Sequence, residues 1–336
     1  MKHPFKRTLS LAIIAFGTLL PSVSSHAQML SDSLAQLVAY WEVGDKYSYN
    51  STITKYKIAD NDTTVVERET SISTYEVVAA DDKMYRLRYT YSTESYNNPV
   101  YTLVNDAIKR LSDLSPIEFE TDEYGSFQRM LPVEWDKLTD AVLEELINDA
   151  VEKNDTLKER KEMFSNMLRS IIQPSTLQMA YQSSIEETLK YHGSKYKIGE
   201  EYSYQYETHN FYVPEGNTIT MNCVFWVDED ATNEDYLTIR SYQEADREDF
   251  METVKTLSRN MISSTGADIS EEEMETELKK AFDSMDASIT IYGEAQFHLG
   301  SGWPVYYYQK KDVIILKDGV EEQHQLIESE TEIILD

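Results

Sequence analysis

One short pattern occurs twice in this sequence, at a distance close to half of its length. Val43–Asn50 reads VGDKYSYN, and Ile198–Gln205 reads IGEEYSYQ. In both copies a glycine and an acidic residue precede tyrosines at every second position, which is typical of a β-strand with one buried face. A repeat at this distance predicts two duplicated units, because the units of a solenoid are shorter.

Further expected strands follow each copy in the same order. Met84–Tyr91 (MYRLRYTY) places tyrosines and a leucine on one face and two arginines on the other, and Tyr236–Tyr242 (YLTIRSY) echoes it. A hairpin comes later in each half, at Ile117–Met130 and at Glu294–Tyr308. The dipeptide Asp318-Gly319, which supplies the positive φ of a tight turn, predicts a last hairpin near the C-terminus.

Apolar residues at helical spacing predict helices between these strands. Ser270 and Glu273 form a capping-box pattern that marks the start of one of them. A shorter stretch, Val100–Ser112, is also expected to be helical. The longer expected helices cover residues 135–151, 157–171, 177–189, 250–261 and 270–285.

Strands grouped together, with helices inserted among them, favour an α+β fold over a doubly wound parallel sheet. We therefore expect two tandem, duplicated units of antiparallel β-sheet, each covered by inserted helices. The expected boundaries are 28–193 for the N-terminal repeat and 194–336 for the C-terminal repeat.

Residues 1–27 are expected to be a signal peptide. Basic residues precede an apolar stretch (Leu9–Leu20), and Ser25 and Ala27 are small residues at the positions that a signal peptidase reads. The sequence thus predicts export to the periplasm or the exterior. Because no cysteine lies near the cleavage point, no lipid anchor is expected, and no later stretch is apolar and long enough to predict a transmembrane segment.

The single cysteine, Cys223, lies in an apolar strand-like run and is expected to be a buried core thiol. The chain carries 31 Lys and Arg against 60 Asp and Glu, a net charge of −29. Nucleic acid is excluded as a partner, since its binding rests on neutralising phosphates with basic side chains. Anionic membrane surfaces are disfavoured for the same reason.

The sequence contains no recognised catalytic or cofactor motif. Asp228–Asp235 resembles the start of a calcium loop but lacks its glycine and its bidentate glutamate. Histidines at zinc-ligand spacing, a nucleophile elbow and a glycine-rich phosphate loop are all absent, so no metal or cofactor is expected. A glycosidase needs only two carboxylates. This acidic chain has many, and the sequence does not single out a pair.

The candidate ligand-binding residues are aromatic and lie beside one expected turn: Trp303, Tyr306, Tyr307 and Tyr308. Because Tyr306 and Tyr307 are adjacent, they must point to opposite faces of a strand, and an outward ring can stack on a sugar or hold an apolar ligand. The alternative is a core strand with one hydroxyl at its rim.

The W-x-V-G-D-K-Y-S-Y opening, the later G-x-x-x-F hairpin and the intervening helices resemble secreted proteins of Gram-negative envelopes. More distantly, antiparallel strands with helices across one face resemble the half-barrel lipoprotein carriers of the LolA/LppX kind. That resemblance implies acyl chains held between a curved sheet and its helices.

Together these observations favour an exported, non-catalytic envelope protein. It is expected to bind an apolar or amphipathic ligand, such as a lipid or glycan, or a protein partner between sheet and helices. Two alternatives remain open: an exported hydrolase of glycans or peptides that uses carboxylates, and a structural or assembly component.

Overall fold

The computed structural model describes residues 29–31, 33–59, 62–96, 117–153, 158–209, 218–228, 235–264 and 270–334. The expected signal peptide, the expected helix at Val100–Ser112 and most of the Asp228–Asp235 loop lie outside the described residues.

Strands make up most of the described chain, and the helices fall in two groups between them. In chain order the elements are β1 (Met29–Ser31), β2 (Leu34–Gln36), β3 (Lys46–Ala59), β4 (Asp62–Asp81), β5 (Met84–Tyr96), β6 (Ile117–Asp122), β7 (Phe127–Met130), α2 (Trp135–Lys153), α4 (Lys161–Ile171), α5 (Pro174–Leu189), β8 (Lys195–Lys197), β9 (Glu201–His209), β10 (Thr218–Val227), β11 (Tyr236–Ala245), α6 (Arg247–Ser264), α7 (Glu271–Phe282), β12 (Met285–His298), β13 (Pro304–Lys317) and β14 (Val320–Ile334).

The main sheet is antiparallel and has eleven strands in the order β7-β6-β5-β4-β3-β14-β13-β12-β11-β10-β9. The C-terminal strand β14 pairs with β3, with Tyr49 opposite Ile333, and so joins the strands of both halves. The α+β class with antiparallel strands is as expected. The two expected sets of strands, however, form one continuous sheet rather than two separate ones.

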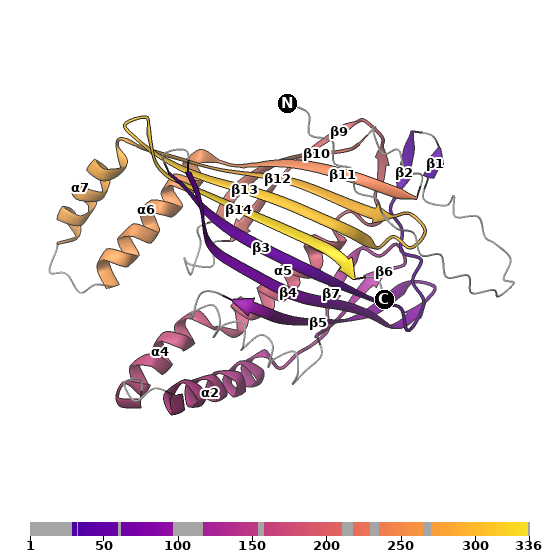
Figure 1. The fold of residues 1–336 in the computed structure, drawn as a ribbon, viewed down its shortest axis with the longest axis horizontal. Helices are drawn as coiled ribbons and strands as arrows, with labels where there is room; N and C mark the ends of the chain where they lie inside the picture. The colour runs from indigo at the N-terminus through magenta and orange to yellow at the C-terminus, as the bar shows by residue number, and fades with distance from the viewer. Residues whose placement is uncertain are drawn as a thin grey trace, which may run out of the picture.

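This sheet curves around α5. Tyr89 on β5 shares a hydrogen bond of 3.3 Å with Ser184 of α5, and Tyr204 on β9 lines a groove together with Lys190 just after the helix. In the sheet order β5 and β9 are eight strand spacings apart, about 38 Å if the sheet were flat. A helix is only about 10–12 Å wide, so both contacts require a concave face that encloses it. Figure 1 shows α5 against this face of the sheet.

Helix α5 begins with Pro174 at its first turn, where the missing N–H costs no hydrogen bond. Its buried residues follow helical spacing and pack, with Trp135 of α2 and the tyrosines of β4 and β5, into the largest core cluster. They are Leu177, Tyr181, Ile185 and Leu189. Helices α2 and α4 lie beside this cluster, so α5 is fixed on the side of the first half.

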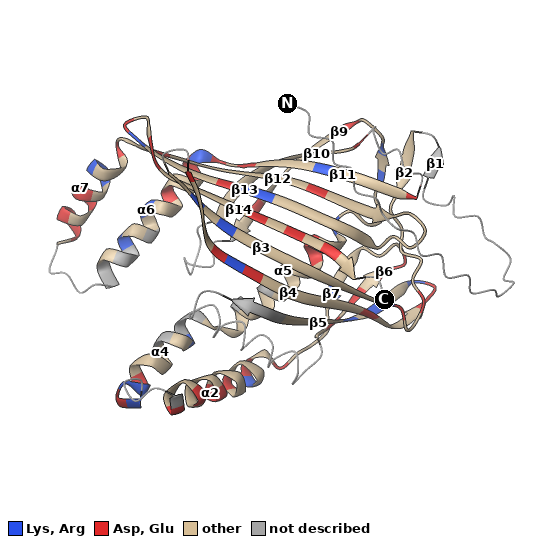
Figure 2. Ribbon diagram, viewed as in Figure 1, with Lys and Arg blue, Asp and Glu red and all other residues tan. Residues whose placement is uncertain are grey.

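The second helical group, α6 and α7, packs on β10 and β12. Phe250 of α6 joins a separate core cluster with Met221 of β10 and Ile289 of β12. The expected capping box of α7 is confirmed, because Ser270 and Glu273 each accept from the other's backbone N–H. Acidic residues are frequent on α7 and α2 and also occur on the strands (Figure 2). No described helix combines the length and the apolar character that a membrane crossing requires.

The segment that precedes β3 forms backbone hydrogen bonds with two of the turns of the main sheet. Ala39 donates its N–H to Tyr124 in the β6–β7 turn (2.9 Å), and Tyr40 donates to Ser301 in the β12–β13 turn (3.3 Å). Gly302 has φ +74°, and a Cβ there would lie 2.3 Å from the carbonyl oxygen of Val38. Glycine is therefore required where the two turns approach this segment.

Candidate binding cavity

A cavity of about 250 Å³ lies between the concave face of the sheet and α5. Most of its lining is tyrosine or small hydroxyl-bearing residues, together with one ion pair. The inward-facing lining residues are Tyr49, Ser51, Ser73, Tyr75, Ser184, Glu187, Thr188, Lys190, Tyr191, Ile239, Ser241, Gly293, Ala295, Tyr307, Gln309, Ser329 and Thr331. Such a surface offers flat apolar rings and hydrogen-bonding edges together, which suits an amphipathic ligand.

Tyrosine hydroxyl groups tether α5 over this cavity. Tyr307 of β13 donates to the carbonyl oxygen of Thr188 at 2.7 Å. The Oγ1 of Thr188 donates to the carbonyl oxygen of Ser184, so Tyr75 of β4 donates in turn to Oγ1, at 2.9 Å. Tyr89 of β5 adds the bond to Ser184 described above. Three strands from both halves thus hold one turn of the helix.

The tethering tyrosines remain neutral. Burial raises the pKa of Tyr75 and Tyr307 well above the ordinary value for a phenol. Tyr49, which donates to the carbonyl oxygen of Pro304 at 3.0 Å, has its pKa raised by burial and by its tyrosine neighbours. The cavity wall therefore offers neutral hydroxyls rather than charges.

The charged part of the lining is the ion pair between Lys190 Nζ and Glu187 Oε1, at 2.6 Å. The side chain of Lys190 is 21% exposed, and its ammonium lies 4.9 Å from the centre of the Tyr191 ring. Burial disfavours the charge, but Glu187 and Tyr191 outweigh it and raise the pKa of Lys190. The end of α5 therefore presents a fixed, neutralised pair to the cavity.

On the far side of the same pair is a groove of about 620 Å³, between α5 and β9. Tyr204, Tyr206 and Met179 line it, and Tyr206 donates to Gln243 at 2.5 Å. Glu187 and Lys190 line both the groove and the cavity, so the two spaces adjoin along α5.

Two arginines, one on β5 and one on β11, make similar ion pairs with the strands on either side of them. Arg88 of β5 lies directly opposite Glu118 of β6 and pairs with it at 3.1 Å. Arg240 of β11 lies directly opposite Glu294 of β12 and pairs with it at 3.0 Å. Each arginine also pairs with a second carboxylate on its other side. These ion pairs lie on the convex face. They fix which positions of β5 and β6 are compared with which positions of β11 and β12 on the concave face.

The concave face has large residues in the first half and small ones in the second. The matched positions, next to the arginine–glutamate pairs, are Tyr89 with Ser241, Ile117 with Gly293, and Phe119 with Ala295. The three large residues fill the core of the first half, whereas the three small ones line the cavity. The small side chains at these three positions leave part of the space of the cavity open.

The four aromatic residues singled out by the sequence do not form one surface. Trp303 is fully buried and lies 4.5 Å from Trp41, ring centre to ring centre. Tyr306 and Tyr308 point to the convex face and donate to Glu330 (3.2 Å) and Glu328 (3.0 Å). Tyr307 and Tyr308 are both among the residues that line the cavity, and of the four Tyr307 bonds to α5.

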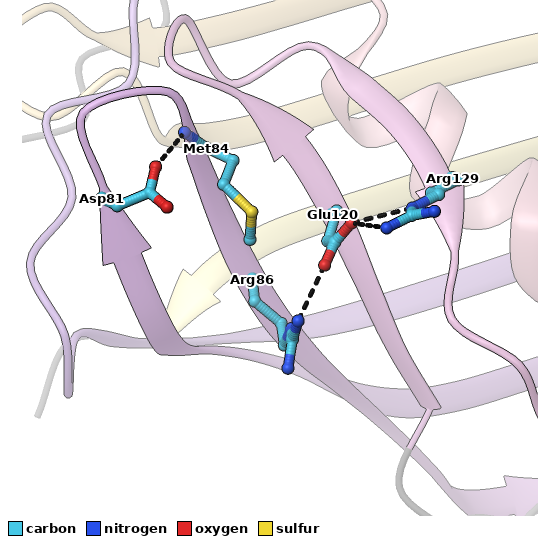
Figure 3. Close-up of polar contacts among 5 residues, drawn as sticks. All are labelled: Asp81, Met84, Arg86, Glu120 and Arg129. Carbon is cyan, nitrogen blue, oxygen red and sulfur yellow. Dashed lines mark hydrogen bonds and ion pairs between the residues drawn. The ribbon is translucent and has the colours of Figure 1, made fainter.

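Cys223 and Glu120 are buried and lie outside the lining of the cavity. Cys223 is buried, as expected, and burial raises the pKa of its thiol. On the convex face Glu120 accepts from Arg86 at 2.8 Å and from Arg129 (Figure 3), and these hydrogen bonds lower its pKa. No group of three or more potential metal ligands gathers among the residues that the structure describes.

Sequence reasoning missed most of the lining. Ser241, Gly293 and Ala295 carry no motif, and their small size is informative only beside their partners in the first half. Lys190 and Glu187 read as surface residues of an amphipathic helix. The one usable signal was the alternation around Tyr307, which required one of two adjacent tyrosines to face inward.

No protein-family model matches the chain, and a search of curated proteins finds no match. Among solved structures, OmpT (in-vitro folded), an outer membrane protein of Vibrio cholerae, aligns over 88% of this chain and 99% of its own, with 7% identity and a TM-score of 0.20. A Salmonella typhi OmpF complex with daunomycin aligns over 87% and 98%, with 6% identity and a TM-score of 0.21. Scores this low carry no argument about fold or function.

Proposed function

We propose that the protein is an exported, non-catalytic envelope protein that binds an amphipathic ligand between its curved sheet and α5. The observation that carries this proposal is the cavity, whose walls are tyrosine rings and hydroxyl groups and whose cover is a single tethered helix. Ligand sites in proteins usually measure about 300–1,000 Å³. The cavity, at about 250 Å³, is slightly smaller than that range, and the adjoining groove of about 620 Å³ extends the space into it.

Export is proposed from the N-terminal sequence. A carrier of amphiphiles in the envelope would meet them outside the cytoplasm, which agrees with that assignment. The resemblance to carriers that hold acyl chains between a curved sheet and its helices points the same way.

We further propose that the two halves, 28–193 and 194–336, arose by duplication. Gly44 and Gly199 open β3 and β9 with φ of +99° and +76°. Each donates its N–H to a valine carbonyl on the neighbouring strand, Val77 at 2.8 Å and Val227 at 3.1 Å. The matched arginine–glutamate pairs support the same origin. On this account one copy kept a filled core and the other opened a binding space.

The alternative of a carboxylate-dependent hydrolase lacks a supporting observation. A general acid needs a carboxyl group with a raised pKa. Hydrogen bonds instead lower the pKa of Glu120, Asp249 and Glu273, which keeps these groups ionised. None of them lines the cavity.

Titration with N-phenyl-1-naphthylamine, a neutral amphiphile that fluoresces in apolar surroundings, tests the proposal. We expect a saturable fluorescence increase with about one probe per chain, reversed by an excess of an unlabelled alkyl alcohol. A folded protein that gives only a linear, non-saturating signal would overturn the proposed function.

A further inference from the structure

Lys311 of β13 lies on the concave face, next to the floor of the cavity. Gln309 lines the cavity two residues earlier, and Val313, two residues later, packs toward the cluster that α6 covers. Alternate residues of a strand share a face, so Lys311 points the same way as both. Its Cα is about 7 Å from that of Gln309, a distance that a lysine side chain spans.

The ammonium of Lys311 has no hydrogen-bond or ion-pair partner among the described residues. The contrast with its neighbour is direct: Lys310, on the convex face, pairs with Asp312 at 3.2 Å. Because the chain carries almost twice as many acidic as basic residues, an unpaired and half-buried lysine stands out. A charge withdrawn from water without a counterion costs free energy, and burial accordingly lowers the pKa of Lys311.

The residues directly opposite Lys311 on the neighbouring strands are apolar. Ile291 of β12 and Ile327 of β14 lie directly opposite it on the two neighbouring strands. Ile53 of β3, also on the concave face, is 37% exposed, so part of this face is left uncovered. A positive charge within an apolar strip matches a molecule with one acidic group and an apolar body.

Two other lysines on this face have carboxylate partners. Lys55 lies in the same row, one strand beyond Ile327, and its Nζ is 3.9 Å from Glu67. Lys190 is paired with Glu187, as described above. Of these three inward-facing lysines, Lys311 is the one that lacks a carboxylate.

We propose that the ligand is an anionic amphiphile with one acidic group, a carboxylate or a phosphate ester, and that this group pairs with Lys311. Its apolar body lies over Ile291 and Ile327 and extends toward the tyrosine-lined cavity. This inference rests on the proposed binding function and adds the class of ligand and the residue that selects it.

Displacement of N-phenyl-1-naphthylamine by decanoate, decyl phosphate and decanol tests the inference. Wild-type protein is expected to bind at least one of the two anions about tenfold more tightly than decanol. The anion with the larger preference identifies the source of the acidic group. Lys311→Met should lose this preference while still binding decanol and the probe, and Lys311→Arg should retain it. Lys310→Met, on the convex face, is the matched control and should behave like the wild type.

Lys311→Met is expected to fold. Replacing an unpaired, half-buried lysine by methionine should leave the melting temperature of the ligand-free protein unchanged or higher. Equal affinities for decanol and both anions in the wild type, or an unchanged preference in Lys311→Met, would overturn the inference and leave the proposed function intact. Failure of the probe itself to bind the wild type would instead overturn the proposed function.

Discussion

Ser241 on β11 lies at the position that Tyr89 takes on β5. Each residue follows an arginine that pairs with the glutamate opposite it on the next strand. Tyr89 reaches α5 with its hydroxyl, whereas Ser241 leaves space beneath the helix. This difference in side-chain size is one of three, with Ile117 against Gly293 and Phe119 against Ala295, that accompany the change from a filled core to a cavity.

Replacing Gly302 by alanine should be much more costly than the same change at Gly319. Both glycines have positive φ, +74° and +77°, so the backbone strain is similar. A Cβ at residue 302 would clash with the Val38 carbonyl, whereas one at residue 319 meets nothing within 4 Å. We expect urea unfolding to show a loss of about 3 kcal/mol or more for Gly302→Ala and about 1 kcal/mol for Gly319→Ala. Equal losses of stability in the two variants would show that the Val38 segment moves away from the added Cβ at no cost in free energy.

His192 should make the fold sensitive to mild acid. The ring is buried between α5 and the β12–β13 turn, and its Nε2 donates to the Gly302 carbonyl at 2.8 Å. Burial lowers the pKa of His192 to about 4, below the ordinary value of 6.5. The unfolded chain therefore takes up a proton first as the pH falls, and stability is lost between pH 6.5 and about 4.

The expected loss is about 2–3 kcal/mol at pH 4.5 relative to pH 7.5, measured by urea unfolding. His192→Gln should be less stable at pH 7.5 but should lack this part of the pH dependence. Carboxyl groups titrate in both proteins, so the difference between them isolates the histidine. An identical pH profile for the two would contradict the assignment.

Removing one tether should loosen α5. Tyr307→Phe deletes the hydrogen bond to the Thr188 carbonyl, whose loss should cost about 1 kcal/mol. Amide hydrogen exchange should then become faster in α5, which has lost an anchor to β13. Tyr306→Phe, whose hydroxyl bonds Glu330 on the convex face, is the control and should leave exchange in α5 unchanged. Equal effects from both changes would show that Tyr307 does not hold the helix.

Local features of the fold could be predicted because their causes are local. The apolar stripe at Trp135, Val142 and Leu146 gives α2, the Ser270 capping box opens α7, and the Asp318-Gly319 turn has φ of +52° and +77°. Each depends only on residues within a few positions of one another.

Features that depend on distant pairing could not be predicted. Nothing near β14 says that it pairs with β3 and merges the two sets of strands. The sequence echo matched Tyr236 with Tyr85, whereas the ion pairs match Arg240 with Arg88, one residue out of step. Because side chains alternate between faces, a shift of one residue compares concave-face positions of one half with convex-face positions of the other. The small residues that line the cavity were therefore not recognised from the sequence.

The most direct test of the account fills the cavity with the side chain that the first half uses. Ser241→Tyr copies Tyr89, and Ser288→Tyr on the convex face is the matched control. A second filling variant, Ser329→Phe, places a large side chain in the cavity from β14. It keeps the test valid if Ser241→Tyr does not fold. Both filling variants, if folded by circular dichroism, should bind N-phenyl-1-naphthylamine at least tenfold more weakly than the wild type, and the control should be unchanged. Wild-type affinity in a folded filling variant would contradict the claim that the space beneath α5 is the binding site.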